Sequence, residues 1–339
     1  MNGSKRSWNR YWTLGSLAVI FAAAAAAMAI GRFTIAPKEL AAVLIPGSFP
    51  DVQVSGQVRT VISNIRFPRV VLALLSGAGL AAAGAAFQGL FANPLATPDT
   101  LGAANGASFG AVLGILLGLP AFGIQTLAMI TGVAAVLMAW SVAQVRGTIP
   151  PLMVILAGMV VSSLFSALVS LVKYAADPQD VLPSITYWLM GSMASTTRTT
   201  LVMGAPFILA GSLLLFLLRW KLNTMSLPED EAKSLGIPVK RIRSLVILGA
   251  AMVTAAVVSM CGQIGWIGLL IPHMVRMIFG NDNRSVVPAS MASGALFMLI
   301  IDTVARSVMA TEIPVSILTS LIGAPCFILL LRKTGGIRL

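Results

Sequence analysis

The feature that most constrains this chain is a series of long apolar segments separated by short polar ones. A helix needs about 20 apolar residues to cross the hydrocarbon core of a bilayer. Ten segments approach or exceed that length, and they predict ten spans with both chain ends on the same side of a membrane. The segments are residues 11–31, 70–90, 100–119, 122–145, 152–175, 200–218, 244–262, 264–279, 286–309 and 315–331.

Composition agrees with a membrane protein. Hydrophobic residues make up 57% of the 339 residues and charged residues only 10%, whereas soluble domains carry about 25% charged residues. We therefore expect an all-α, polytopic membrane protein with one transmembrane domain over residues 1–339. The net charge of +12 would suit nucleic acid, but the basic residues lie at the ends of apolar segments. Membrane lipid is thus an expected partner and nucleic acid is not.

The lysines and arginines predict the orientation, because cytoplasmic loops of membrane proteins carry an excess of them. With the N-terminus inside, fifteen of the 23 Lys and Arg residues fall in inner segments and eight in outer ones. We therefore expect both termini in the cytoplasm and the protein in the cytoplasmic membrane. An error of one span would invert every later loop, and the short segment 264–279 is the place where it would most easily arise.

One polar stretch between two apolar segments is well marked as a helix. It reads NTMSLPEDEAKSLGIPVKRIR over residues 223–243, and we expect helix from about 227 to 235. Ser226 and Glu229 have the spacing of a capping box, and Gly236 can supply a left-handed end. Three adjacent acids fill the first turn, where the helix dipole is positive, and Lys233 lies near the other end. The acids are Glu229, Asp230 and Glu231.

Two proline-containing motifs interrupt the apolar background. In FANPLATPDTLGAANGA, residues 91–107, Asn93 and Pro94 predict a tight turn between two spans. In GWIGLLIPHMVRMIFGNDNR, residues 265–284, Pro272 predicts a kink or break. His273 is the only histidine of the chain. We interpret it as a hydrogen-bonded structural residue, since the sequence offers it no partner for catalysis or metal binding.

No pattern of a catalytic or metal site is present. The chain lacks the GxxxxGK[ST] phosphate loop, HExxH, and a GxSxG elbow with supporting His and Asp residues. Cys261 and Cys326 are far apart and have no ligand spacing. Asp302 is the main acid within a span, four residues before Arg306, which suits a helical ion pair. We expect no enzyme activity, no cofactor and no metal.

Six blocks of the sequence together resemble the permeases of iron–siderophore, haem and cobalamin ABC importers. They are distributed along the chain from residue 65 to the C-terminus, and they say little about the substrate. The blocks are IRFPR (65–69), FQGLFANPLATPDTLGAANGA (87–107), SLPEDEAKSLGIPVKRIR (226–243), GQIGWIGLLIPHMVRMIFGNDNR (262–284), IDTVARSVMATEIPVSILT (301–319) and GAPCFILLLRK (323–333).

The resemblance implies a ten-span permease that works as a homodimer or heterodimer, with two cytoplasmic ATPase subunits and an extracytoplasmic binding protein. The loop that matches residues 226–236 docks into the ATPase in that family. The implied coupling residues are Ser226, Glu229, Asp230, Glu231, Lys233 and Gly236. Arginines that match Arg66, Arg69 and Arg306 face outward there and pair with acids of the binding protein. The substrate path lies between two permease copies, lined largely by the fifth and tenth spans.

Ferric siderophore is the favoured substrate, with haem and cobalamin as alternatives. A secondary transporter is a further alternative, because segments 69–88 and 243–263 resemble each other and would enter the membrane from opposite sides, as in an inverted repeat. The scarcity of carboxylates within the spans argues against an ion-driven carrier. A membrane-embedded enzyme is the weakest alternative, because no nucleophile, base or metal set is present.

Overall fold

The chain folds into helices and connecting turns. The computed structural model describes residues 10–45, 47, 49, 51–144, 150–227 and 229–333, apart from the side chains of residues 151, 226, 331 and 333. Within these residues no strand is present. The α-helices are α1 (Arg10–Ala29), α2 (Pro37–Leu44), α3 (Gly56–Thr60), α4 (Phe67–Leu90), α5 (Ala103–Leu116), α6 (Ala121–Ala143), α7 (Pro151–Ala175), α8 (Val181–Leu189), α9 (Arg198–Leu222), α10 (Glu229–Ser234), α11 (Val239–Cys261), α12 (Ile267–Phe279), α13 (Asn283–Ala305) and α14 (Val315–Lys333).

Three short segments connect these helices. A π-helix, Val61–Arg66, joins α3 to α4 without a break. Two 3-10 turns, Pro98–Leu101 and Asn223–Ser226, precede α5 and α10. π-helical turns inside a longer helix often mark functional positions, and this one ends on Arg66, one of the arginines singled out by the sequence.

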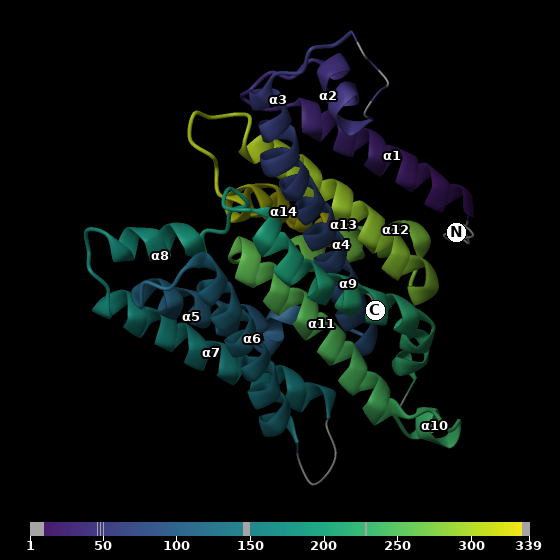
Figure 1. Cartoon of the computed structure of the whole chain (residues 1–339). Helices are drawn as coiled ribbons and strands as arrows, with labels where there is room; N and C mark the ends of the chain where they lie inside the picture. The colour runs from purple at the N-terminus through teal and green to yellow at the C-terminus, as the bar shows by residue number, and fades with distance from the viewer. Residues whose placement is uncertain are drawn as a thin grey trace.

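The long helices run between two ends of the molecule (Figure 1). One end, called here the α8 end, carries α2, α3, α8 and the segment from α13 to α14. The other, the α10 end, carries α10, the start of α1 and the turn between α12 and α13. At the α8 end Arg198 donates to the carbonyl of Ser63 at 2.9 Å. At the α10 end the rings of Trp12 and Phe279 meet edge to face, 5.4 Å apart.

Helix α4 lies at the centre of the bundle (Figure 1), where it packs against α9, α11, α12 and α13. Nineteen of its residues are buried, and most of these are glycine or alanine. Small side chains let helices in a membrane approach closely and gain contact over a long interface. At Gly77 a Cβ would lie 2.2 Å from the Gly294 carbonyl oxygen of α13, so these two backbones touch directly.

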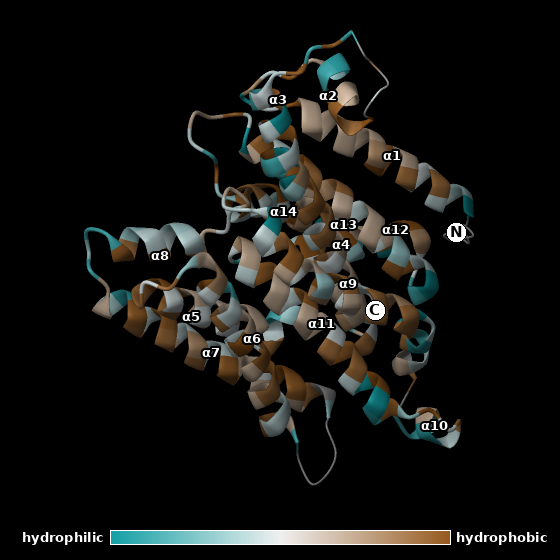
Figure 2. Cartoon of the chain, viewed as in Figure 1, coloured by the Kyte–Doolittle hydropathy of each residue, from teal (hydrophilic) through white to brown (hydrophobic). Residues whose placement is uncertain are grey.

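The outer helices consist largely of hydrophobic residues (Figure 2), and many of their large apolar side chains are exposed. On α7 the exposed residues recur at helical spacing and form one stripe, and others lie on α1, α6, α9 and α14. An aqueous surface would not carry so many exposed large hydrophobic residues, whereas lipid tails accept them. The α7 stripe contains Leu152, Leu156, Met159, Val160 and Leu164.

Each of the ten predicted spans corresponds to a helix, so the expected all-α fold is confirmed. Seven helices of the described residues are long and apolar enough to cross a membrane, namely α1, α4 with α3, α6, α7, α9, α11 and α13. The other three apolar helices, α5, α12 and α14, are shorter. The count of ten spans therefore stays a prediction.

The sequence predicts a kink or a break at Pro272, and the structure shows no break there. Helix α12 continues through Pro272, and the break falls at residues 262–266, before the helix begins. Proline has no N–H for the carbonyl four residues earlier, which here is that of Gly268. The backbone of α4 passes directly beside this carbonyl, because a Cβ at Gly84 would lie 1.8 Å from the Gly268 oxygen. The close neighbour is thus backbone from a second helix.

Candidate functional site

Helix α10 is the polar helix that the sequence predicted, although it is shorter than expected. It spans Glu229–Ser234 rather than about 227 to 235. Ala232 is buried, whereas Asp230, Glu231 and Lys233 are exposed. Residue 228 and the side chain of Ser226 lie outside the described residues, so the capping box stays a prediction. The exposed acids are available to a partner at this end of the molecule.

The C-terminal end of α10 has the predicted left-handed glycine. Gly236 has φ +72° and donates its N–H to the Lys233 carbonyl at 2.9 Å. Ile237 donates to the Ala232 carbonyl at 3.0 Å. This pair of bonds is the Schellman motif, which satisfies the last carbonyls of a helix, so the chain leaves α10 in a defined direction.

Glu229 attaches α10 to the start of α11. Its carboxylate lies 3.0 Å from Lys233 Nζ and 3.2 Å from Nη2 of Arg243, a buried residue of α11. The hydrogen bond from Lys233, together with that from Arg243, lowers the pKa of Glu229. Glu229 is therefore engaged within the chain, whereas the side chains of Asp230 and Glu231 have no hydrogen-bond or ion-pair partner among the described residues.

Asn223 connects the approach to α10 with the turn between α12 and α13. Its side-chain amide donates to Asp282 Oδ1 at 2.7 Å, and its Oδ1 accepts from the backbone N–H of Asn283 at 2.8 Å. Hydrogen bonds from Arg284 first, and from Asn223, lower the pKa of Asp282 to about 2. The turn is thereby bound to the segment that carries α10.

Arg276 of α12 extends this network to α4. It donates to the Ala85 carbonyl at 2.9 Å, to Asn283 Oδ1 at 2.9 Å and to Gln88 Oε1 at 3.2 Å. Gln88 in turn donates to the Leu269 carbonyl at 3.2 Å. The polar network therefore runs from the segment before α10 to α4 and α12.

The turn with Asn93 and Pro94 lies beside Arg276. Asn93 Oδ1 accepts from the Leu95 N–H at 2.9 Å, so the predicted tight turn is confirmed. A cavity of about 190 Å³ separates this turn from Arg276 and Asn283. The structure thus brings together two of the motifs. Sequence analysis overlooked Arg276 and Asn283, although both lie in the motif that contains Pro272.

At the α8 end, Arg66 and Arg306 bind the end of α1. Arg66 donates to the carbonyls of Met28 and Ala29 at 2.6 and 2.8 Å, and also to that of Phe33. Arg306 donates to the carbonyl of Ile30 at 2.7 Å, and also to that of Ala27. The last carbonyls of a helix have no partner within it and carry a partial negative charge, which cations neutralise.

Arg69 belongs to the same cluster of charged residues, which consists of Arg66, Arg69, Asp302, Arg306 and Glu312. Its Nε lies 2.8 Å from Asp302 Oδ1 and its Nη1 2.9 Å from Glu312, whose side chain is 25% exposed. Asp302 also lies 3.5 Å from Arg306 Nε, so the predicted helical ion pair is present. The cluster joins α1, α4, α13 and the segment after α13.

The three arginines of this cluster are buried, so a partner cannot reach their side chains freely. Arg66, Arg69 and Arg306 are only 4%, 5% and 8% exposed, and their donors bind groups within the chain. The count of lysines and arginines predicted that all three lie on the same side of the membrane, but it did not predict that their side chains are buried. No sequence signal shows that the carbonyls of α1 lie within reach of Arg66 and Arg306.

His273 and Trp266 face α14. The imidazole of His273 lies 5.9 Å from the Phe327 ring, and its Nε2 has no hydrogen-bond partner in the described part of the chain. The prediction of a hydrogen-bonded histidine is therefore not met at this nitrogen. Trp266 adopts φ +72°, which is rare for a bulky residue, and a Cβ at Gly323 would lie 2.7 Å from its indole. Both side chains mark the boundary between α12 and α14.

Comparison with known proteins identifies the family. The model of the FecCD transport family matches residues 17–333. The molybdate import system permease protein MolB of Haemophilus influenzae is 40% identical over 307 residues, 90% of each chain. The cobalamin import system permease protein BtuC of Halobacterium salinarum is 37% identical over 275 residues, 81% of this chain and 74% of that protein.

A third relative and a solved structure are consistent with the same family. An iron chelatin transport system permease protein of Helicobacter pylori, named as probable, is 37% identical over 277 residues, 82% of this chain and 84% of that one. A structure described as an inward-facing metal-chelate type ABC transporter is 38% identical, with a TM-score of 0.85 over 96% of this chain and 100% of that chain. The chain therefore belongs to the FecCD transport family, and it is a permease of the ABC importer type.

Proposed function

We propose that this chain is the permease subunit of an ATP-driven importer that passes a ferric siderophore across the cytoplasmic membrane. A separate ATPase powers it at the α10 end, and a binding protein delivers the substrate at the α8 end. The observation that carries the proposal is α10 itself, a short helix with exposed acids whose neighbouring segments are bonded to α11 and to the α12–α13 turn.

The geometry supports α10 as the ATPase contact. A displacement of α10 would be transmitted to α11 through the ion pair of Glu229 and Arg243. It reaches α12 and α4 through Asn223, Asn283 and Arg276. Hydrogen-bond and salt-bridge networks of this kind can carry energetic coupling between distant sites. Ser226, Lys233 and Gly236 belong to the same proposed contact, and Gly236 gives its exit direction.

A second copy or a paralogue of the chain would complete the transporter. We place the substrate path between two permeases, along α7 and α14, which correspond to the fifth and tenth predicted spans. The stripe of exposed apolar residues on α7 supports this placement, because such a surface suits either lipid or another apolar helix.

A binding protein would dock at the α8 end, where Arg66, Arg69 and Arg306 are the proposed docking residues. Because these side chains are bonded within the chain, docking requires an exchange of partners. Glu312 is the partially exposed acid of the cluster, so an acidic side chain of a binding protein would replace it on Arg69.

Ferric siderophore, haem and cobalamin all suit the proposal, and molybdate is a second candidate. The molybdate candidate rests on the 40% identity to the permease named for that oxyanion over 90% of each chain. The path residues do not decide among them, since substrate selection is assigned here to the binding protein.

Reconstitution tests the proposal. Proteoliposomes that contain the chain, its ATPase and its binding protein should take up labelled ferric siderophore only with ATP, with haem, cobalamin and molybdate measured in parallel. Vesicles without the ATPase are the control. Uptake driven by an ion gradient in that control would show a secondary transporter instead. Uptake of another of the four compounds alone would correct the substrate and leave the machinery unchanged.

A further inference from the structure

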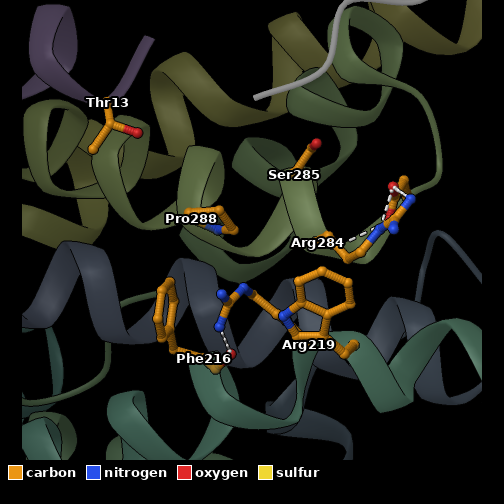
Figure 3. A pocket seen from close by; sticks show the side chains of 8 residues that line it. Thr13, Phe216, Arg219, Arg284, Ser285 and Pro288 are labelled. Atoms are coloured by element: carbon orange, nitrogen blue, oxygen red, sulfur yellow. Dashed lines mark hydrogen bonds and ion pairs between the residues drawn. The ribbon is translucent and has the colours of Figure 1, made fainter. Parts of the chain in front are cut away.

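A cavity of about 430 Å³ opens at the α10 end between α1, α9 and α13 (Figure 3). The proposed import function assigns no role to this cavity, although Asp282 at its edge also accepts a hydrogen bond from Asn223, which precedes α10. Its side chains combine cations with aromatic rings: Phe216, Arg219 and Trp220 from α9, and Arg284 and Pro288 from α13, with Asp282 beside them.

Arg219 supplies a cation without a counter-ion in this cavity. Its guanidinium carbon lies 3.8 Å from the centre of the Phe216 ring, and its Nη1 donates to the Phe216 carbonyl at 2.7 Å. Figure 3 shows the guanidinium beside that ring, facing the cavity. No acid lies within ion-pair distance of Arg219 among the residues that the structure describes.

Arg284 and Asp282 set the net charge of the cavity. Arg284 Nη2 lies 2.6 Å from Asp282 Oδ2, and its guanidinium carbon is 5.1 Å from the Trp220 ring. This pair is neutral as a whole, so Arg219 leaves one net positive charge on the lining. A group with one negative charge would balance it, whereas a dianion would leave the occupied cavity with a net negative charge.

An apolar groove of about 530 Å³ continues from this cavity. The two share Thr13, Phe216 and Pro288. The groove runs between α1 and α9 over α4 and α13, and apolar side chains form nearly all of its lining, for example Leu17, Ile20, Leu75, Leu213, Met291 and Ala292. A charged cavity therefore opens directly into an apolar channel along the membrane-spanning helices.

The cavity lies at the level where spanning helices end. Helix α1 begins at Arg10, α9 ends at Leu222 and α13 begins at Asn283. Trp12 and Trp220 are both found in the same region of these helices. Tryptophan is enriched where headgroups meet acyl chains, and arginine places its charge at the same level.

We propose that this cavity and groove bind one anionic phospholipid from the leaflet at the α10 end. Its phosphodiester, with a single negative charge, accepts hydrogen bonds from Arg219 beside Arg284, and an acyl chain fills the groove between α1 and α9. Guanidinium and phosphate form strong charge-assisted hydrogen bonds. The single charge and the long apolar groove select a lipid phosphodiester over free phosphate.

The test is lipid retention by the full chain purified in a mild detergent, read by native mass spectrometry after addition of phosphatidylglycerol or phosphatidylcholine. Phosphatidylglycerol should bind in a ratio of one per chain and be displaced by neither phosphatidylcholine nor inorganic phosphate. Arg219→Gln should weaken phosphatidylglycerol binding roughly tenfold, because one charge-assisted contact is lost. Lys221→Gln removes an exposed charge two residues away, outside the cavity, and should leave binding unchanged.

A second pair of variants tests the groove. Ala292→Phe adds bulk inside it and should abolish retention, whereas Ser293→Phe adds the same bulk on the exposed side of α13 and should not. Each variant must elute as the wild type does in size-exclusion chromatography. Equal loss in Lys221→Gln, equal binding of phosphatidylcholine, retention in Ala292→Phe, or a bound polypeptide in place of lipid would each overturn the proposal.

Discussion

At the residue scale, the buried cluster at the α8 end is defined by which acid each arginine meets. Asp302 lies fully buried between Arg69 and Arg306, whereas Glu312 is partly exposed and covers Arg69 alone. Removing one member of a buried pair leaves an uncompensated charge, which costs about 3–5 kcal/mol. Replacing the arginines would therefore disrupt the junction of α1, α4 and α13, so a docking role is better tested through Glu312.

Glu312→Gln should strengthen binding of the cognate binding protein if Arg69 docks it. The substitution frees Arg69 for an acidic partner at the edge of the cluster, and one such pair is worth roughly two- to fivefold in affinity. The measurement is a titration of binding protein onto the chain in nanodiscs at low salt, where charge pairs are least screened.

Asp51→Asn is the matched control, since Asp51 is exposed in the segment between α2 and α3. It should leave the affinity unchanged. Unaltered or weaker binding by a correctly folded Glu312→Gln variant would contradict the docking role of Arg69.

At the element scale, α10 has an exposed acidic face and an attached one. Asp230 and Glu231 form the exposed face, and Glu229 holds the helix on α11. Reversing the charge of Glu229 would therefore weaken the attachment of α10 to α11. Reversing the charges of Asp230 and Glu231 would change only the charge of the exposed surface. This distinction could not be drawn from the sequence, in which the three acids are adjacent and equivalent.

The double variant Asp230→Lys/Glu231→Lys should weaken ATPase association roughly tenfold, because two charge contacts across an interface become repulsive. Transport should fall with it. Co-elution of the ATPase with the permease measures the association. The double variant Asp51→Lys/Asp180→Lys makes the same charge change at the α8 end and should keep full association. Undiminished co-elution of Asp230→Lys/Glu231→Lys would remove α10 as the docking element.

The contact between α4 and α12 leads to a prediction about packing. A Cβ at Gly84 would lie 1.8 Å from the Gly268 oxygen, which is a backbone atom and cannot rotate away. Gly84→Ala should therefore lower stability by ~1–3 kcal/mol or more, as overpacking does, and lower the thermal midpoint in detergent. Gly15→Ala is the control, because a Cβ at Gly15 would meet nothing within 4 Å, and its midpoint should not fall.

Hydropathy and helix-capping signals predicted the positions of the helices, but they did not predict the features that depend on tertiary contacts. All ten apolar segments form helices, and the expected left-handed glycine, Gly236, follows α10. The π-helix that ends at Arg66 and the position of the break before α12 follow from packing. So do the burial of the three arginines and the role of Arg276, since their partners lie on helices far away in sequence.

At the scale of the whole molecule, the two ends differ in what they offer. The α10 end has exposed acids on α10 and the cationic cavity, and the α8 end has the buried arginine cluster. The excess of lysines and arginines predicts that the α10 end is cytoplasmic. The number of spans depends on α5, α12 and α14, because these three helices are too short for their length alone to show that they cross the membrane.

Sided cysteine labelling in intact cells checks this orientation. Asp180→Cys at the start of α8 should react with a membrane-impermeant maleimide from outside. Lys233→Cys on α10 should react only after permeabilisation, because the two residues are exposed at opposite ends. The unmodified chain controls for Cys261, which is buried, and Cys326, which is partly buried. The reverse pattern would invert the orientation and with it the proposed positions of both partners.

The left-handed backbone of Trp266 has a consequence for motion. A bulky residue in this conformation costs of order 1–3 kcal/mol unless its surroundings hold it there, and here the indole packs against Gly323 and lies 6.4 Å from the Phe327 ring. The contact with α14 therefore holds Trp266 in this conformation, and a movement of α14 away from α12 would remove that support.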